Sequence, residues 1–166
     1  MGATLMDATG LHRTVIRLSH EIGERNKGYS NIVLVGVKKN GGIVAGRIRD
    51  YIRDTEGFTL PLAGLDPDAG NNELGFSIDG KTVVLCDDVL YTGKSTVKSV
   101  DALFRLGNPK KIQLLVLVDR GGRELPVRAD FVGKNAPASK DEYIEVSFEE
   151  LGAPDCFSII RRKNET

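Results

Sequence analysis

Two adjacent carboxylates, Asp87 and Asp88, follow the apolar segment 83–86. This segment predicts a buried strand, so the carboxylates should lie at the carboxyl end of a strand, where open α/β sheets bind their ligands. Neighbouring carboxylates repel each other but accept hydrogen bonds well, and two vicinal sugar hydroxyls offer donors at a matching separation. The pair therefore predicts a site for a ribose.

The residues that follow the carboxylates could bind an anion: Thr92, Gly93, Lys94, Ser95 and Thr96. They open a predicted helix, whose first turn has free N–H groups at the positive end of the helix dipole. The glycine permits close backbone approach, and the hydroxyls can donate as well. We expect a phosphate here. With the ribose carboxylates just before it, the stretch Val83 to Thr96 predicts a ribose 5-phosphate site.

Two other interpretations compete for this stretch. Ser95 or Thr96 could simply cap a helix while the carboxylates are solvated, but the succession of both features behind a buried strand favours a site. Residues 93–96 also match the end of a P-loop. The first glycine of that motif would fall at Asp88, whose carboxylate would repel a triphosphate, so we disfavour a nucleotide triphosphatase.

The surrounding pattern predicts an α/β fold with a mainly parallel sheet flanked by helices. Apolar residues at helical spacing predict helices over 11–22, 44–52 and 97–104, the last ended by Gly107. Short apolar runs predict strands at 32–37, 58–62, 83–86 and 112–118. Strand-like pieces at 130–132, 143–148 and 157–160 predict a small β-rich hood over the sheet.

Two connecting segments carry turn signals. Residues 63–75 are rich in Gly, Pro, Asp and Asn and predict a short mobile loop. Asp79 and Gly80 form the dipeptide that suits a tight hairpin, so we expect a small hairpin between 76–78 and 82–86.

Composition indicates one domain over residues 1–166, with 40% apolar and 28% charged residues. Lys plus Arg and Asp plus Glu are both 23, so there is no global positive field for nucleic acid or an anionic membrane. Apolar runs are too short to span a bilayer and the N-terminus has no leader-like stretch, so we expect a cytoplasmic protein. Cys86 and Cys156 lie far apart and are expected to be buried thiols.

The stretch VVLCDDVLYTGKST resembles the signature of type I phosphoribosyltransferases. The segments LSHEIGERNKG and IQLLVLVDRGGRELPVRADFVGKNAPASK are similar to the PyrR family, a pyrimidine operon attenuator with uracil phosphoribosyltransferase activity. The likeness covers nearly the whole chain. It implies a type I phosphoribosyltransferase fold, a homodimer or higher homo-oligomer, and Mg²⁺ bridged by the substrate without a protein metal site.

The resemblance also implies roles for individual residues. Asp87 and Asp88 would be the catalytic pair that holds the ribose hydroxyls of phosphoribosyl pyrophosphate (PRPP), and Thr92 to Thr96 would bind its 5-phosphate. The pyrophosphate would meet Lys38, Lys39, Asn40 and Gly41. The base, a pyrimidine such as uracil, would meet Asp119, Arg120, Val132 and Lys134. The implied reaction is displacement of pyrophosphate by a nitrogenous base, through a cation-like state that the carboxylates stabilise.

Three departures from the family bear on catalysis. Asn40 stands where the family has an arginine, which removes a bidentate donor for pyrophosphate. The loop before the signature strand is shorter than in the family, and such loops exclude water during transfer. Gly122 replaces a histidine at the edge of the implied base pocket. The alternative function is therefore a regulator that senses UMP, UTP or PRPP without turnover.

RNA is a further possible partner of such a regulator. Arg13, Arg17 and His20 form a basic stripe on the first helix, and His20 and Lys134 match positions of the family's RNA-facing surface. Glu24 shares that surface and the net charge is zero, so a solvated helix face is the favoured interpretation. Residues Arg17, His20 and Lys134 are the candidates if RNA does bind.

Overall fold

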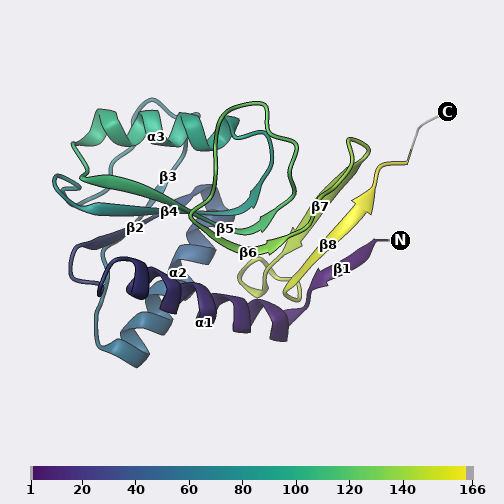
Figure 1. Ribbon diagram of the computed structural model, residues 1–166, viewed down its shortest axis with the longest axis horizontal. Coiled ribbons are helices and arrows are strands. Elements are labelled where there is room, and N and C mark those ends of the chain that lie inside the picture. Colours follow the sequence, from purple (N-terminus) through teal and green to yellow (C-terminus); the bar gives the residue numbers. More distant parts are fainter. Residues whose placement is uncertain (1, 164–166) are drawn as a thin grey trace.

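A computed structural model describes residues 2–163. Its centre is a parallel sheet of five strands in the order β3-β2-β4-β5-β6. The strands are β2 (Ile32–Val37), β3 (Leu62–Leu65), β4 (Thr82–Leu90), β5 (Lys111–Asp119) and β6 (Phe131–Asn135). Helices α1 (Ala8–Arg25) and α2 (Lys38–Glu56) cover one face and α3 (Lys94–Leu106) covers the other (Figure 1). The predicted fold class is confirmed.

Alternation along the central strands builds two cores. Leu34, Val84 and Leu115 pack with α1 and α2, whereas the residues next to them, Val35, Leu85 and Val116, pack on the α3 side. Since both faces of the sheet are covered, β2, β4 and β5 contain buried apolar runs at 32–35, 83–86 and 114–118, as expected for parallel strands. The buried strands fix the positions of the residues at their carboxyl ends. These ends point toward the hood (Figure 1).

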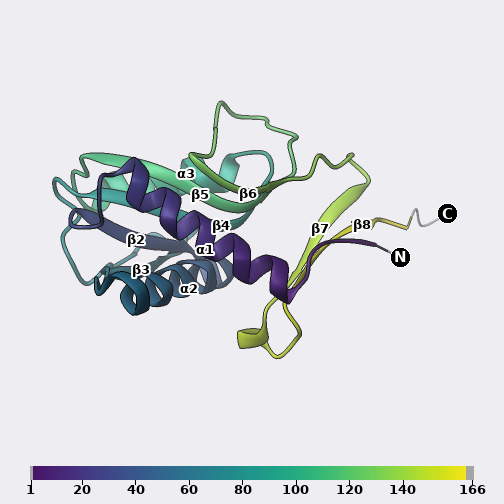
Figure 2. The same cartoon turned by 60° about the horizontal axis from the view of Figure 1, so that its bottom comes forward.

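The hood is a separate antiparallel sheet in the order β1-β8-β7. It contains β1 (Ala3–Met6), β7 (Glu142–Ser147), the short 3-10 helix η1 (Glu149–Leu151) and β8 (Cys156–Arg161). Figure 2 shows it standing apart from the parallel sheet, with the amino-terminal end of α1 beside it. Phe148 and Phe157 are fully buried against each other and join the hood to the core under the sheet.

One predicted strand is placed differently, and one strand of the hood was not predicted. The piece at 130–132 belongs to β6, the edge strand of the parallel sheet, where Val132 is paired with Val116 of β5. It had looked like part of the hood because an edge strand is short and ends in polar residues. The hood strand β1 was not predicted, because its four residues give too little periodicity to read.

The segment 58–65 also differs from the prediction. The strand lies at 62–65, because Ala63 and Leu65 turn their side chains inward while Phe58 remains exposed. The expected hairpin at Asp79 and Gly80 is a turn without a preceding strand: the Lys81 N–H donates to the Ile78 carbonyl (3.0 Å) and Gly80 has a positive φ of 68°. The Asp79 carboxylate instead accepts from the Asn108 N–H (2.7 Å).

Both cysteines are free thiols; Cys86 is buried, as predicted, whereas Cys156 is only half-buried. No helix within residues 2–163 combines the length and the apolar character needed to cross a bilayer.

Candidate functional site

The strand that carries the two carboxylates is longer than its sequence suggests. β4 continues to Leu90, so Asp87 and Asp88 lie inside the strand and not after it. The register with β2 ends at Cys86, whereas pairing with β5 continues to Leu90. The carboxylates satisfy local N–H groups where β2 has ended: the Asp88 N–H donates to Asp87 Oδ1 (2.9 Å), and the Val89 N–H donates to Asp88 Oδ1 (2.7 Å).

Burial, and then the charge of Asp88, raises the pKa of the Asp87 carboxyl to about 8. At neutral pH this group therefore holds a proton in the free protein. A ligand that brings hydroxyl donors or a cation to the pair would favour the ionised form. The two carboxylates are thus suited to bind donors or positive charge.

The predicted phosphate cradle lies at the start of α3. Gly93 has a positive φ of 91° and is the N-cap residue, so no side chain at the cap position bonds the first helical turn. A Cβ on Gly93 would come within 3.0 Å of Val127, which shows how closely the loop 120–130 covers this turn. Lys94 Nζ forms an exposed ion pair with Glu124 (2.9 Å), and Thr96 is buried.

The predicted pyrophosphate residues 38–41 form the first turn of α2 and are not a loop before it. The Asn40 amide Nδ2 donates to Asp88 Oδ2 (2.9 Å), which joins this turn directly to the ribose carboxylates. A Cβ on Gly41 would lie 2.4 Å from the Cys86 carbonyl oxygen, so only glycine permits this approach of α2 to β4. The structure therefore brings the carboxylates and the pyrophosphate residues together.

Two charged residues that the sequence did not single out lie beside this turn. The Asp68 carboxylate accepts from Lys38 Nζ (2.9 Å) through one oxygen and from Lys98 Nζ (3.1 Å) through the other. Asp68 sits in a loop whose composition signals only turns, and Lys98 sits on an exposed helix face, so neither had a sequence signal.

The predicted base residues are split between two surroundings. Arg120 is buried: its Nη atoms donate to the carbonyls of Glu142 (2.8 Å) and Ser139 (3.0 Å), and its guanidinium stacks on Tyr91. Lys134 Nζ donates to the Leu5 carbonyl (3.2 Å) in the hood strand β1. Both side chains therefore tie the parallel sheet to the hood.

Arg120 leaves one buried donor free. Its Nε is buried and has no hydrogen-bond partner within residues 2–163. The Tyr91 ring covers the guanidinium, and a Cβ on Gly122 would come within 2.5 Å of that ring. The absence of a side chain at Gly122 is thus what gives Tyr91 its place over Arg120.

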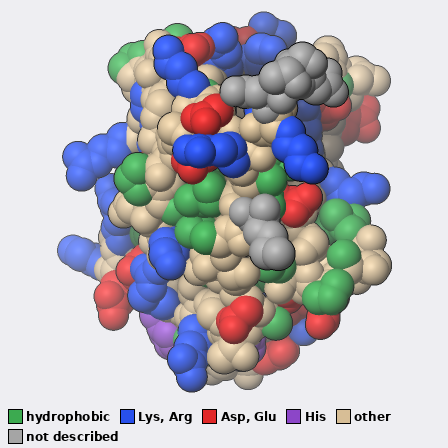
Figure 3. All heavy atoms as spheres, turned by 90° about the vertical axis from the view of Figure 1, so that its right-hand side faces the viewer, with side chains coloured by type: hydrophobic (Ala, Val, Ile, Leu, Met, Phe, Trp, Pro, Cys, Tyr) green, Lys and Arg blue, Asp and Glu red, His purple; other side chains and the backbone are tan. Residues whose placement is uncertain are grey.

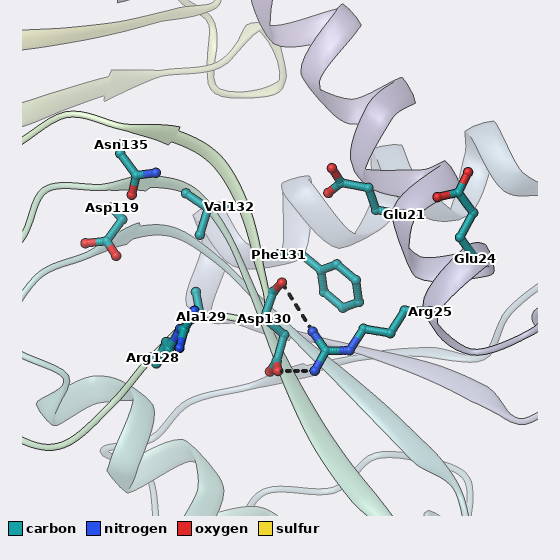
Figure 4. Close-up of a pocket in the computed structure, with 10 residues that line it drawn as sticks. All are labelled: Glu21, Glu24, Arg25, Asp119, Arg128, Ala129, Asp130, Phe131, Val132 and Asn135. Atoms are coloured by element: carbon teal, nitrogen blue, oxygen red, sulfur yellow. Dashed lines mark hydrogen bonds and ion pairs between the residues drawn. The ribbon is translucent and has the colours of Figure 1, made fainter.

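Asp119 and Val132 line a cavity of about 710 Å³ along the outer side of β6. Figure 4 shows Arg25 reaching from α1 to Asp130 beside the Phe131 ring, with Asp119 and Asn135 at the far end. Although burial opposes it, the hydrogen bond from Arg123 lowers the pKa of the Asp119 carboxyl. The cavity contains none of the predicted ribose or phosphate residues, so it is a neighbouring hollow and not the ribose site itself.

The candidate RNA residues all make contacts within the protein. Arg17 donates to the Gly133 carbonyl (2.6 Å) on the free edge of β6 and pairs with Glu21 (3.0 Å). His20 Nε2 hydrogen-bonds the Tyr51 hydroxyl (3.0 Å), while Lys134 binds the hood. Among residues 2–163, no group of three or more His, Cys, Asp or Glu side chains is arranged to hold a metal ion.

Comparison with known proteins bears on this arrangement. Residues 3–151 match the phosphoribosyl transferase domain family. A protein of Clostridioides difficile named Bifunctional protein PyrR is 46% identical over 171 aligned positions, covering 95% of this chain and 97% of that protein. A protein of the same name from Pelotomaculum thermopropionicum is 45% identical over 163 positions, covering 90% of each chain.

Solved structures agree at the level of the fold. The hypoxanthine phosphoribosyltransferase of Trypanosoma cruzi superimposes with a TM-score of 0.78 at 16% identity, covering 97% of both chains. A hypoxanthine-guanine phosphoribosyltransferase of Bacillus anthracis gives a TM-score of 0.73 at 23% identity, covering 95% of this chain and 98% of that one. The type I phosphoribosyltransferase fold predicted from the sequence is therefore confirmed.

Proposed function

The chain belongs to the phosphoribosyl transferase family, and from this premise we propose that it transfers ribose 5-phosphate from PRPP to a pyrimidine base and releases pyrophosphate. The observation that carries the proposal is the carboxylate pair Asp87 and Asp88 in contact with the first turn of α2, just before the first turn of α3. Uracil is the proposed base, on the resemblance to the PyrR family.

In this proposal each element holds one part of the donor. The carboxylates of Asp87 and Asp88 accept hydrogen bonds from the ribose hydroxyls, and their charge stabilises the cation-like sugar as the bond to pyrophosphate lengthens. Residues Thr92 to Thr96 hold the 5-phosphate through main-chain N–H groups and hydroxyls at the positive end of α3. Lys38 to Gly41 take the pyrophosphate. The base would enter from the side of Asp119, Arg120, Val132 and Lys134.

Magnesium fits the proposal as a substrate-bridged ion. Asp87 lies partly buried beside Asp88, and a hard cation held partly by the ligand would offset the repulsion between these carboxylates. When bound, the ion would neutralise charge on the leaving pyrophosphate. The protein would contribute acceptors at Asp87 and Asp88 and a position for the ribose.

A turnover assay tests the proposal. Purified protein is incubated with PRPP, magnesium and each nucleobase in turn, and released pyrophosphate is followed. We expect release with uracil and none without a base. The variant carrying Asp87→Asn and Asp88→Asn should lose both turnover and UMP binding; undiminished UMP affinity in that variant would refute the ribose assignment.

One observation favours a second function, sensing without turnover. Asn40 stands where the resemblance implies an arginine, and its amide is already engaged by Asp88 (2.9 Å). A protein that only binds UMP or a related nucleotide does not need to bind pyrophosphate. Tight UMP binding together with no pyrophosphate release for any base would establish this alternative and exclude the transferase.

The proposal extends to the whole molecule. We propose that residues 1–166 act as one domain, in the cytoplasm, and that the chain forms a homodimer or higher homo-oligomer as the resemblance implies. Light scattering on the purified protein measures the oligomeric state directly, and a monomeric mass at all concentrations would contradict the assembly.

A further inference from the structure

One carboxylate holds two lysines that come from opposite sides of the parallel sheet. Asp68 Oδ2 binds Lys38 at the start of α2, and Asp68 Oδ1 binds Lys98 in the second turn of α3 (2.9 and 3.1 Å). Each oxygen takes one ammonium group, an arrangement that one phosphoryl group could also make. The three residues therefore form a two-lysine anion site that already contains an anion.

Asp68 lies in a loop that is held together by hydrogen bonds between its own residues. The Asn72 side chain accepts from the Asp66 N–H (2.9 Å) and donates to the Asp66 carbonyl (2.8 Å), which closes the loop at its base. The Asp68 N–H donates to the Asp66 carboxylate (2.9 Å). Buried Leu65 before the loop and buried Ile78 after it anchor both ends. The carboxylate is thus held in place by its own loop.

The lysine pair adjoins the groups assigned to the donor. Lys38 directly precedes the turn whose Asn40 contacts Asp88, and it is near enough to Asp87 to oppose the rise in the pKa of that carboxyl. Lys98 lies two residues beyond Thr96, the last of the predicted 5-phosphate residues. An anion between the lysines would therefore lie next to both the ribose carboxylates and the phosphate cradle, where the departing pyrophosphate must be.

We propose that Lys98 and Lys38 together form the pyrophosphate-binding pair, and that Asp68 occupies their site in the free protein until the donor displaces it. This inference rests on the proposed function and deepens it. Lys98 supplies a further cation at the pyrophosphate site, where Asn40 stands in place of an arginine. Asp68 acts as an internal competitor for the same two cations.

Displacement is feasible because all three side chains are more than half exposed. Exposed ion pairs are weak and are screened by salt. A carboxylate carries one negative charge, whereas pyrophosphate carries several and can contact both lysines at once. The incoming ligand therefore gains more from the lysines than Asp68 gives up.

Binding of inorganic pyrophosphate, measured by calorimetry at low salt with and without magnesium, tests the inference. Lys98→Ala should weaken binding about tenfold, the loss of one charge-assisted contact. Asp68→Asn should strengthen binding about threefold to tenfold, because the competing charge is gone. Lys110→Ala removes the same charge at the amino-terminal end of the parallel strands, opposite to the site, and should change affinity less than twofold.

The outcomes separate this inference from the proposed function. Unchanged pyrophosphate affinity in Lys98→Ala, or weaker binding in Asp68→Asn, overturns the lysine pair whatever the turnover assay shows. UMP binding that does not depend on Asp87 and Asp88, combined with the expected pyrophosphate results, refutes the ribose assignment and leaves the lysine site standing. Circular dichroism confirms that each surface variant is folded.

Discussion

Asp87 lies partly buried beside a second carboxylate, an arrangement that destabilises the free protein and suits a ligand. Because its pKa is raised to about 8 in the folded chain, folding favours the protonated form. The sign follows from linkage: the stabilisation is complete below the ordinary pKa of 3.8 and is lost as the pH rises through about 8. The unliganded protein should therefore become less stable from pH 4 to pH 8, as far as this group is concerned.

Asp87→Asn should separate stability from binding. We expect the free energy of unfolding of the unliganded protein at pH 8 to rise by about 1–3 kcal/mol, since the amide cannot ionise. The gain should vanish near pH 4, and UMP binding should be lost at every pH. Urea unfolding from pH 4 to pH 8 measures whether the gain in stability is present at pH 8 and absent near pH 4. Asp101→Asn, an exposed carboxylate on α3, is the matched control and should stay within about 0.5 kcal/mol.

Gly41 shows how a single missing Cβ sets the distance between two elements. Gly41→Ala should cost about 1–3 kcal/mol, because its methyl group would meet the Cys86 carbonyl oxygen at 2.4 Å and push α2 from the end of β4. Gly42→Ala is the matched control, since a Cβ there meets no described atom within 4 Å. That variant should be neutral or more stable by about 0.5–1 kcal/mol. Equal melting temperatures for the two variants would contradict the close contact.

At the scale of elements, one arginine of α2 forms a network of ion pairs with the hood. Arg47 donates to both oxygens of Glu150 (2.8 and 2.6 Å) and to both oxygens of Asp155 (2.7 and 2.8 Å). Its guanidinium also lies over the Phe148 ring. This is a bidentate contact to two carboxylates, a strong geometry for an ion pair. The orientation of the hood over the sheet therefore depends on a short network of charges.

Arg47→Met should lower the free energy of unfolding by about 2–3 kcal/mol, because it leaves the Asp155 carboxylate, whose side chain is only 8% exposed, without its cation. Urea unfolding at pH 7 measures the loss. Arg53→Met on the same helix removes an exposed arginine and should cost less than about 1 kcal/mol. A loss as small in Arg47→Met as in Arg53→Met would show that the hood is held by its apolar contacts alone.

The same network predicts a dependence on pH. Hydrogen bonds from Arg47 lower the pKa of Asp155 and of Glu150. Lowered carboxyl pKa values give stability that is present above the ordinary values of 3.8 and 4.5 and is lost as the pH falls through the folded ones. The stability difference between wild type and Arg47→Met should therefore shrink below about pH 4. A difference that stays constant down to pH 3 would argue against this network.

Sequence patterns predicted the elements that are long and buried. The helix around Leu11 to Ile22 and the strands at 32–37 and 112–118 were predicted to within a few residues, because their apolar spacing is a local property. The strands β1, β3 and β6 were missed or misplaced. Their positions depend on pairing partners far along the chain, which short segments do not reveal.

At the scale of the whole molecule, charge is balanced and dispersed. The net charge is zero, and Figure 3 shows acidic and basic side chains interspersed over the face that carries the hood. Arg17 and Lys134 both donate hydrogen bonds to main-chain carbonyls. A protein that binds the RNA backbone needs free cationic side chains on one surface. In this chain the candidate RNA residues already form hydrogen bonds within the protein.

We therefore expect pyrimidine leader RNA to bind no more tightly than non-specific complexes do, with a Kd of about 1 µM or weaker at physiological salt. Filter binding over a salt series measures this, and Arg17→Ala and His20→Ala should leave the affinity unchanged. A salt-dependent Kd in the nanomolar range that either variant abolishes would instead restore RNA as a partner.

The sequence by itself determined the parts of this protein that lie close together along the chain. The carboxylates, the phosphate turn and the strand before them fall within residues 83–96, so residue types and spacing were enough to predict a ribose 5-phosphate site. The tertiary structure decided everything that depends on distant contacts: Asn40 on Asp88, Asp68 between Lys38 and Lys98, and Arg120 clamped to the hood. The reason is physical. A hydrogen bond or ion pair acts over a few ångströms, and only folding brings residues from separate strands and loops within that range.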